Sequence, residues 1–143
     1  MGSSRVFLAL DLGEKRVGIA KSDELGMFAH ALSYVEFVSE ENFYEELKRL
    51  IEEFEPARVI VGYPLALTGE RGIAAQKVEK KVEVFRERFP KMTFELWDER
   101  LTTKAAEMYL RASGKSQTKR RQRVDSLSAQ ILLQDYMDAN KGD

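Results

Sequence analysis

Several chemically specialised residues are absent or scarce in this chain of 143 residues, which has no cysteine, one histidine and one tryptophan. Without cysteine, the chain can form no disulfide framework, no cysteine-ligated zinc site and no thiol nucleophile. A serine hydrolase triad is excluded as well, because only His30 could serve as the base and no nucleophile motif surrounds a serine. The sequence also contains neither a Walker A loop nor a GxGxxG fingerprint.

Long apolar runs are missing too. No stretch approaches the ~18 residues of a membrane span, and residues 1–6 show neither the apolar core of a signal peptide nor a myristoylation pattern. We therefore expect a cytoplasmic protein without a membrane partner.

Neither sign of charge is in large excess. The chain contains 23 Lys and Arg and 24 Asp and Glu, so its formal net charge is -1. Hydrophobic residues make up 43% of the chain, which excludes an intrinsically disordered protein. The length predicts a single domain over 1–143, with flexible ends at 1–4 and 139–143. With so little net charge, any binding of nucleic acid must come from a local basic patch.

The hydrophobic pattern predicts five strands and four helices. The expected strands cover residues 5–10, 17–20, 28–38, 58–62 and 92–97. The expected helices cover residues 39–55, 73–89, 102–112 and about 124–138, the first capped by Ser39. Three strands in close succession predict an antiparallel meander, and the alternation that follows predicts an α/β domain with a mixed sheet.

Acidic residues stand at the ends of two predicted strands and near the start of the last predicted helix. Asp11 closes the first strand, Asp98 and Glu99 close the fifth, and Asp125 opens the helix. Each has a structural explanation: an Asx turn with Gly13 for Asp11, a helix N-terminus that favours acids for Asp98 and Glu99, and an N-cap for Asp125. Ligands of α/β sheets, however, gather at the carboxyl ends of strands.

If these acids meet, a cation must neutralise them. Carboxylate oxygens suit Mg²⁺ or Mn²⁺, and two such ions can together promote phosphodiester cleavage. We therefore expect Asp11, Asp98, Glu99 and Asp125 as catalytic candidates. Asp11, Glu99 and Asp125 are the expected metal ligands, with Glu99 preferred to Asp98 because its side chain is longer.

A basic run precedes Asp125 and contains no acid. Such a run is either a solvated loop or a contact for nucleic acid phosphates, and its position beside a predicted metal ligand favours the second. Three further cations follow the strand-end acids and could hold phosphates or form ion pairs. The candidate nucleic-acid-binding residues are thus Lys15, Arg16, Arg100, Lys115, Lys119, Arg120, Arg121 and Arg123.

Three other features have structural explanations that we prefer. Trp97 is expected to pack in the core rather than to stack on a base, and His30 is expected to be structural rather than a general base. Residues 62–64 with Gly69 are expected to form a tight turn rather than a ligand-binding loop.

Four motifs in order give the chain a resemblance to a known family. Residues 11–20 (DLGEKRVGIA) resemble the opening signature of the YqgF/RuvX family. So do residues 62–65 (GYPL) with Gly69, residues 98–103 (DERLTT) with Ala106, and residues 124–127 (VDSL) leading to 131–136 (ILLQDY). The resemblance covers nearly the whole chain, and the first and third motifs are the most specific.

The resemblance implies an RNase H-like fold, with a five-stranded mixed sheet and helices on both faces, and a metal-dependent nuclease. Family members are assigned to 5′-end processing of pre-16S rRNA, or to Holliday junction resolution by similarity to RuvC. Carried over residue by residue, Asp11, an acid of the Asp98–Glu99 pair and Asp125 are the implied metal ligands.

The chain departs from the family pattern at three places. RuvC-type resolvases carry a glutamate at the end of the fourth strand, where this chain has Tyr63 and Pro64, so the acid must come from the fifth strand. Ala66 replaces a common Asn, and Ser128 replaces a common Ala.

We therefore expect a nuclease with two Mg²⁺ or Mn²⁺ ions that acts on structured RNA, as a monomer or a homodimer. A junction-cutting DNA endonuclease and a non-catalytic nucleic-acid-binding factor are the alternatives, and a stable two-fold dimer would favour the first of them.

Overall fold

The structure is a computed structural model that describes residues 6–36, 38–66, 68–99 and 117–140, with only the backbone described at 33, 34 and 117–126. Its elements, in chain order, are β1 (Phe7–Leu12), β2 (Arg16–Ser22), β3 (Ala29–Glu36), α1 (Glu40–Phe54), β4 (Arg58–Tyr63), α2 (Ile73–Arg88), β5 (Phe94–Asp98) and α4 (Gln117–Ala139).

The five strands form one mixed sheet in the order β3-β2-β1-β4-β5. β1, β2 and β3 pair antiparallel, whereas β4 and β5 run parallel to β1 and to each other. This confirms the predicted meander and the mixed sheet. Because β1, β4 and β5 point the same way, their carboxyl ends lie at the same edge of the sheet.

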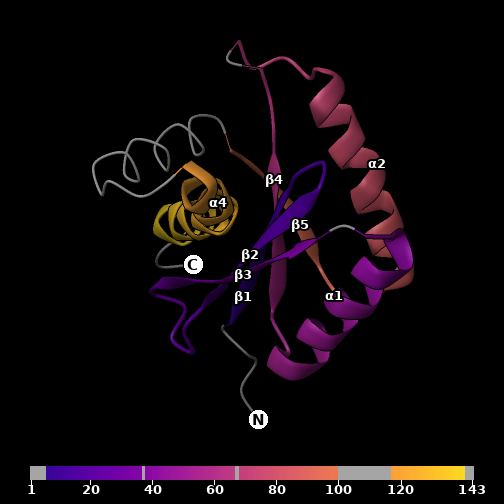
Figure 1. Ribbon diagram of the computed structural model, residues 1–143. Helices are drawn as coiled ribbons and strands as arrows, with labels where there is room; N and C mark the ends of the chain where they lie inside the picture. The colour runs from indigo at the N-terminus through magenta and orange to yellow at the C-terminus, as the bar shows by residue number, and fades with distance from the viewer. Residues whose placement is uncertain (1–5, 37, 67, 100–116, 141–143) are drawn as a thin grey trace.

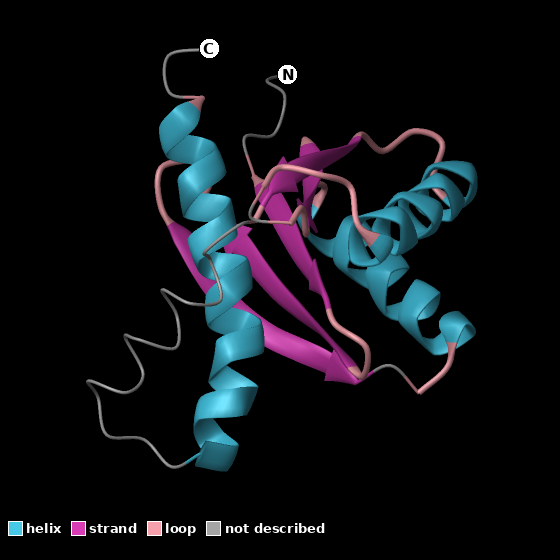
Figure 2. Cartoon of the chain, turned by 90° about the horizontal axis from the view of Figure 1, so that it is seen from above, coloured by secondary structure: helices cyan, strands magenta, loops and turns pink. Residues whose placement is uncertain are grey.

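Helices cover both faces of the sheet (Figures 1 and 2), as the resemblance implies. α1 and α2 lie on one face and α4 crosses the other. Alternation along the strands divides the core accordingly. Leu8 and Leu10 of β1 belong to the cluster with α1 and α2, and Ala9 belongs to the cluster with α4.

The face of the sheet under α4 is built largely from small residues. Ala9, Ala20 and Ala29 are buried there, as is Ala129 of α4 itself. Small side chains let the helix backbone lie close to the strands, so α4 can carry short side chains near the sheet.

Two side chains of α4 also hold it to the first residue of the edge strand β3. The backbone N–H of Ala29 donates to Gln134 Oε1 at 2.9 Å, and the Gln130 Nε2 donates to the Ala29 carbonyl at 3.2 Å. Both polar backbone groups of this edge residue are therefore satisfied by the helix, which fixes the position of α4 along the sheet.

The predicted helix boundaries hold at α1 and fail at α4. Ser39 caps α1, its Oγ accepting from the Asn42 N–H at 3.1 Å. α4 begins at Gln117 rather than near residue 124, so the predicted start of the last helix is wrong. Gln, Lys and Arg are good helix formers, and without Gly or Pro the basic run continues as helix. The predicted helix over 102–112 lies outside the described residues.

At the chain ends, residues 1–4 and 141–143 lie outside the described part, and Ala139 is the last residue of α4. None of the helices in the described ranges combines the length and apolar character that crossing a membrane requires.

Candidate active site

Asp11 is the second-to-last residue of β1 and pairs with Gly18 of β2. Strand alternation puts Asp11 on the same face as Ala9, the face covered by α4. The chain then turns tightly, with the Gly13 N–H donating to the Arg16 carbonyl at 2.8 Å. A Cβ on Gly13 would meet that carbonyl oxygen at 2.7 Å, so the turn requires glycine. The expected turn at Gly13 is thus present, and Asp11 precedes it within the strand.

Glu99 reaches Asp11 from two strands away. It follows the last residue of β5, and its backbone N–H donates to the Tyr63 carbonyl at 3.1 Å, which extends the pairing of β4 and β5 by one residue. Its side chain forms a hydrogen bond with Asp11. Two carboxyl groups from distant parts of the chain therefore meet at the carboxyl ends of β1 and β5.

The contact is possible because β4, which separates β1 from β5, has no side chain at residue 62. A Cβ on Gly62 would stand 2.1 Å from Glu99 Oε2 and 3.3 Å from Leu132 Cδ2 of α4. The Glu99 carboxyl group occupies the space that a β4 side chain would fill. Gly62 lies in β4, paired with Trp97, which confirms the strand predicted over residues 58–62, so the tight turn expected from residue 62 does not begin there.

The environment of Glu99 favours its neutral form. Burial of the carboxyl group is the largest cause, and the negative charge of Asp11, a hydrogen bond to Asp11 and the charge of Asp98 add to it, which together raise the pKa of Glu99 to about 8. At neutral pH and without a cation, Glu99 therefore carries a proton that it donates toward the Asp11 carboxylate.

Asp98 lies one residue before Glu99, at the end of β5. By alternation it belongs to the face of Phe94 and Leu96, which pack with α1 and α2. Its charge still contributes to the raised pKa of Glu99. The structure thus brings Glu99 against Asp11 and leaves Asp98 beside the pair.

Asp125 belongs to α4, eight residues after the helix begins. It therefore cannot be the N-cap considered from the sequence. It precedes the buried residues Ser128, Ala129 and Leu132 by three, four and seven positions, the spacing of one helical face. Its side chain lies outside the described part, and among the described side chains no group of three His, Asp or Glu residues converges as a metal site.

The basic candidates divide between two places. Lys15 is exposed in the β1–β2 turn at the same sheet edge as Asp11, and Arg16 begins β2. The backbone of residues 119, 120, 121 and 123 belongs to the first turns of α4. Arg100 and Lys115 lie outside the described residues.

A network that the sequence did not reveal holds the loop after β4. The Tyr63 hydroxyl donates to Glu79 of α2, and the Arg71 guanidinium donates to the same carboxylate, with Nε to Oε2 at 2.7 Å. Hydrogen bonds from Arg71 and Tyr63 lower the pKa of Glu79 to about 2. The loop that borders Glu99 is thereby tied to α2, and Tyr63 points away from the acidic pair.

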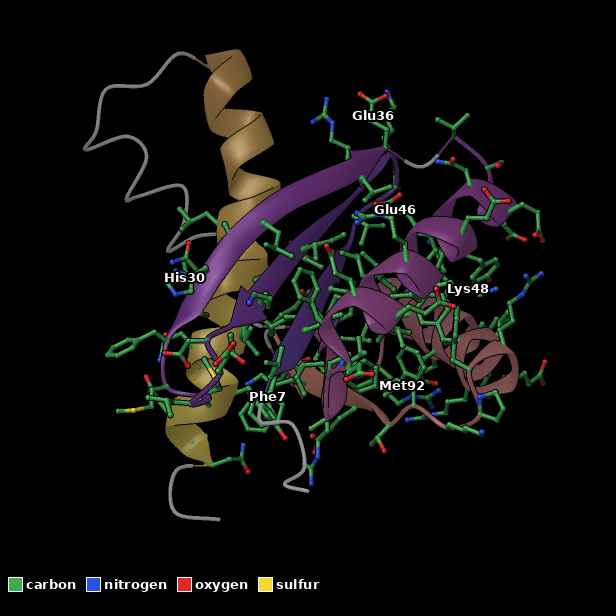
Figure 3. The ribbon with its side chains drawn as sticks, turned by 90° about the horizontal axis from the view of Figure 1, so that it is seen from below. Phe7, His30, Glu36, Glu46, Lys48 and Met92 are labelled. Atoms are coloured by element: carbon green, nitrogen blue, oxygen red, sulfur yellow. The ribbon has the colours of Figure 1, made fainter. Side chains whose placement is uncertain are left out.

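Trp97 and His30 were both expected to have structural roles. Trp97 packs edge-on against Tyr136, with ring centroids 5.1 Å apart, and its Nε1–H donates to Asp135 at 3.2 Å. This is the packing role expected from the sequence. His30 is exposed near the start of β3, and Figure 3 shows it at the opposite end of that strand from Glu36. Since Glu36 pairs with Arg16 beside the β1–β2 turn, His30 lies at the wrong end of the sheet to assist Asp11.

The sheet order and the helices on both faces define an RNase H-like domain. Solved structures support the fold. RuvC from T. thermophilus, in complex with Holliday junction substrate, matches with a TM-score of 0.56 at 16% identity, covering 96% of each chain. Fowlpox virus resolvase with Holliday junction DNA matches with a TM-score of 0.57 at 11% identity, covering 94% of this chain and 97% of that one.

Sequence relatives define the family. The family model RuvX, described as Holliday junction resolvase, matches residues 5–139. A protein of Geobacillus kaustophilus (strain HTA426) named "Putative pre-16S rRNA nuclease" is 38% identical over 136 residues, covering 94% of this chain and 98% of its own. One of the same name from Syntrophus aciditrophicus (strain SB) is 42% identical over 132 residues, covering 92% and 87%. The chain belongs to the RuvX family of nucleases.

Gly62→Ala is expected to reduce the cleavage rate about a hundredfold, because the new Cβ would displace the Glu99 carboxyl group and small misplacements at a catalytic site have effects of this size. The matched control is Gly72→Ala, since a Cβ at Gly72 meets nothing within 4 Å. Cleavage rates of the two variants under identical conditions check the prediction. Equal rates for both variants would show that Glu99 need not occupy this space.

Proposed function

We propose that this nuclease hydrolyses phosphodiester bonds of structured RNA with the help of divalent cations, and that it acts in 5′-end processing of pre-16S rRNA. The observation that carries the proposal is the contact between Asp11 and Glu99 across the glycine gap in β4. Two partly buried carboxyl groups in contact are unfavourable unless they share a proton or bind a cation.

The donor set fits Mg²⁺ or Mn²⁺, which prefer carboxylate oxygens. Asp11 and Glu99 are the described ligands, and Asp125 is the third because its position on α4 belongs to the helical face that packs on the sheet. We propose two ions, which Asp11, Glu99 and Asp125 would hold. When bound, they would stabilise the negative charge that develops on the attacking and leaving oxygens of the phosphodiester.

The residues of the chain have separate tasks in this proposal. Glu99 would release its proton to solvent when a cation binds, so that both carboxylates could serve as ligands. Asp11 is oriented by the pairing of β1 with β2 on one side and β4 on the other. Gly62 keeps the space between them open, and Asp98 adds negative charge nearby without facing α4.

Basic residues would hold the nucleic acid backbone on either side of the acids. Lys15 and Arg16 approach from the β1–β2 turn, and Lys119, Arg120, Arg121 and Arg123 from the first turns of α4. Together with Arg100 and Lys115 they would contact phosphates, which gives binding without sequence preference.

The substrate assignment rests on the relatives, whose names specify pre-16S rRNA. A bacterial enzyme with this substrate works in the cytoplasm. A single domain over residues 1–143 suffices for the chemistry described, as a monomer or as each half of a homodimer.

The proposal is tested by offering the protein two substrates with Mg²⁺ or Mn²⁺: an RNA that carries the precursor 5′ end of 16S rRNA, and a four-way DNA junction. We expect cation-dependent cleavage of the RNA and little cleavage of the junction. Selective cutting of the junction would assign the protein to DNA resolution instead. Failure to cut either substrate with either cation would contradict the proposed nuclease mechanism.

Binding titrations with the RNA at several salt concentrations examine the basic residues at the start of α4. A variant in which Arg120, Arg121 and Arg123 are replaced by Gln should bind RNA more weakly, and the slope of log affinity against log salt should fall by up to about 2 for single-stranded contacts. An unchanged slope would show that these three arginines do not contact the phosphates of the RNA.

A further inference from the structure

Ser128 has a buried hydroxyl group that the fold does not use. Its side chain is 1% exposed, and its Oγ is the buried side-chain oxygen that has no hydrogen-bond partner in the described part of the chain. A buried hydroxyl without a partner is unfavourable, so such a group in a folded protein calls for a ligand or an ordered water.

The other buried serine shows what a structural hydroxyl looks like in this protein. Ser22 is fully buried in β2, where its Oγ accepts from the Phe7 N–H at 2.7 Å and lies 3.1 Å from the Asp23 carbonyl, to which it donates. The Ser22 hydroxyl joins two strands, whereas the Ser128 hydroxyl joins nothing. Packing alone would be served equally well by alanine at residue 128.

Ser128 lies on the part of α4 that approaches the acidic pair. One turn later, Leu132 packs beside the Glu99 carboxyl group over Gly62. One turn earlier stands Asp125, the proposed third ligand. At its far end α4 packs on the beginnings of the strands, where Tyr136 contacts Phe7 of β1 in an edge-on pair with centroids 5.8 Å apart. Tyr136, Leu132 and Ser128 therefore lie in this order along the sheet, from the end where β1 begins toward the edge that carries Asp11.

We propose that Ser128 is a positioning residue for the divalent cation site and accepts a hydrogen bond from a water molecule of the cation's hydration shell. The inference rests on the proposed function. Mg²⁺ and Mn²⁺ retain several waters when few carboxylates bind them, and these waters need acceptors when they are buried. A serine oxygen offers two lone pairs and no charge, so it can orient such a water without adding another negative group to the site.

The test is a calorimetric titration of the full-length, nucleic-acid-free protein with Mn²⁺, comparing wild type with Ser128→Ala. We expect the dissociation constant to rise at least about tenfold, the size usual for groups that orient metal ligands from outside the coordination sphere. The melting temperature without metal should stay the same or increase, because the substitution removes an unsatisfied buried group. That combination separates a role toward the cation from a role in folding.

Ser22→Ala is the matched control. It deprives the Phe7 N–H of its acceptor, so it should lower the melting temperature without metal while leaving the Mn²⁺ affinity unchanged. If the Ser128→Ala variant binds Mn²⁺ as tightly as wild type while the Asp11→Asn variant does not bind it, the cation site exists but Ser128 does not contribute to it. If Asp11→Asn and wild type titrate alike, the proposed cation site itself fails, and the role of Ser128 fails with it.

Discussion

Asp11→Asn is expected to abolish cation-dependent cleavage, with a rate at least about a thousandfold below wild type, while the protein folds normally. The substitution removes one of the two charges that meet at the ends of β1 and β5. A cation held there supplies several kcal/mol of charge stabilisation, and about 4 kcal/mol corresponds to a thousandfold in rate. Folding should not suffer, because the side-chain oxygen of asparagine can still accept the hydrogen bond that the protonated Glu99 donates.

The measurement is the cleavage rate of precursor rRNA with Mg²⁺ and with Mn²⁺, together with the melting temperature of each protein. Asp135→Asn is the matched control, because Asp135 is an exposed acid of α4 that pairs with Trp97 rather than with the acidic pair. It should cleave within about twofold of wild type. Turnover by Asp11→Asn at the wild-type rate would rule out the cation mechanism.

Glu99→Gln is expected to stabilise the metal-free protein at pH 8 and above, although it removes a proposed ligand. The raised pKa of Glu99, about 8 against 4.5 for the ordinary group, means that the folded state holds a proton that the unfolded chain releases. Its contribution to stability is therefore complete below about pH 4.5 and is lost as the pH rises through 8. A glutamine amide donates to Asp11 at every pH.

The expected gain in the free energy of unfolding at pH 8.5 is on the order of 3 to 5 kcal/mol, from a shift of this size. Near pH 4.5 the two proteins should be equally stable. Denaturant unfolding in EDTA at pH 4.5, 7 and 8.5 measures the difference. Glu14→Gln, a change at an exposed glutamate of the β1–β2 turn, should follow wild type at each pH. A gain from Glu99→Gln that does not grow with pH would show that Glu99 is not protonated in the folded protein.

The two outcomes complement each other. The Asp11→Asn and Glu99→Gln variants should both lose cleavage if the pair holds the cation. Only Glu99→Gln should gain free energy of unfolding, relative to wild type, as the pH rises from 4.5 to 8.5. If the pair holds a cation as proposed, stability and catalysis oppose each other at this site, because the arrangement that would bind a cation is unfavourable without it.

Much of the fold could be predicted from the local pattern. Apolar runs marked all five strands, Ser39 marked the start of α1, and Asp11 and Asp98–Glu99 stood where their strands end. These features depend on neighbours along the chain, since side-chain periodicity and capping act over a few residues. The start of α4 was mispredicted because residues 117–123 contain no apolar residue to mark a helical period, whereas intrinsic helix propensity continues the helix back to Gln117.

The sequence by itself determined the five strands, the helices α1, α2 and α4 in their order and the presence of acids at strand ends, together with the motifs of the RuvX family. Only the tertiary structure decided that Glu99 meets Asp11, because β1 and β5 lie on either side of β4 and the contact passes over Gly62. The same is true of Ser128, whose unused hydroxyl is visible only once α4 is packed on the sheet. Contacts between distant strands depend on strand order and on which face each residue takes, and neither is encoded in the spacing of a single segment.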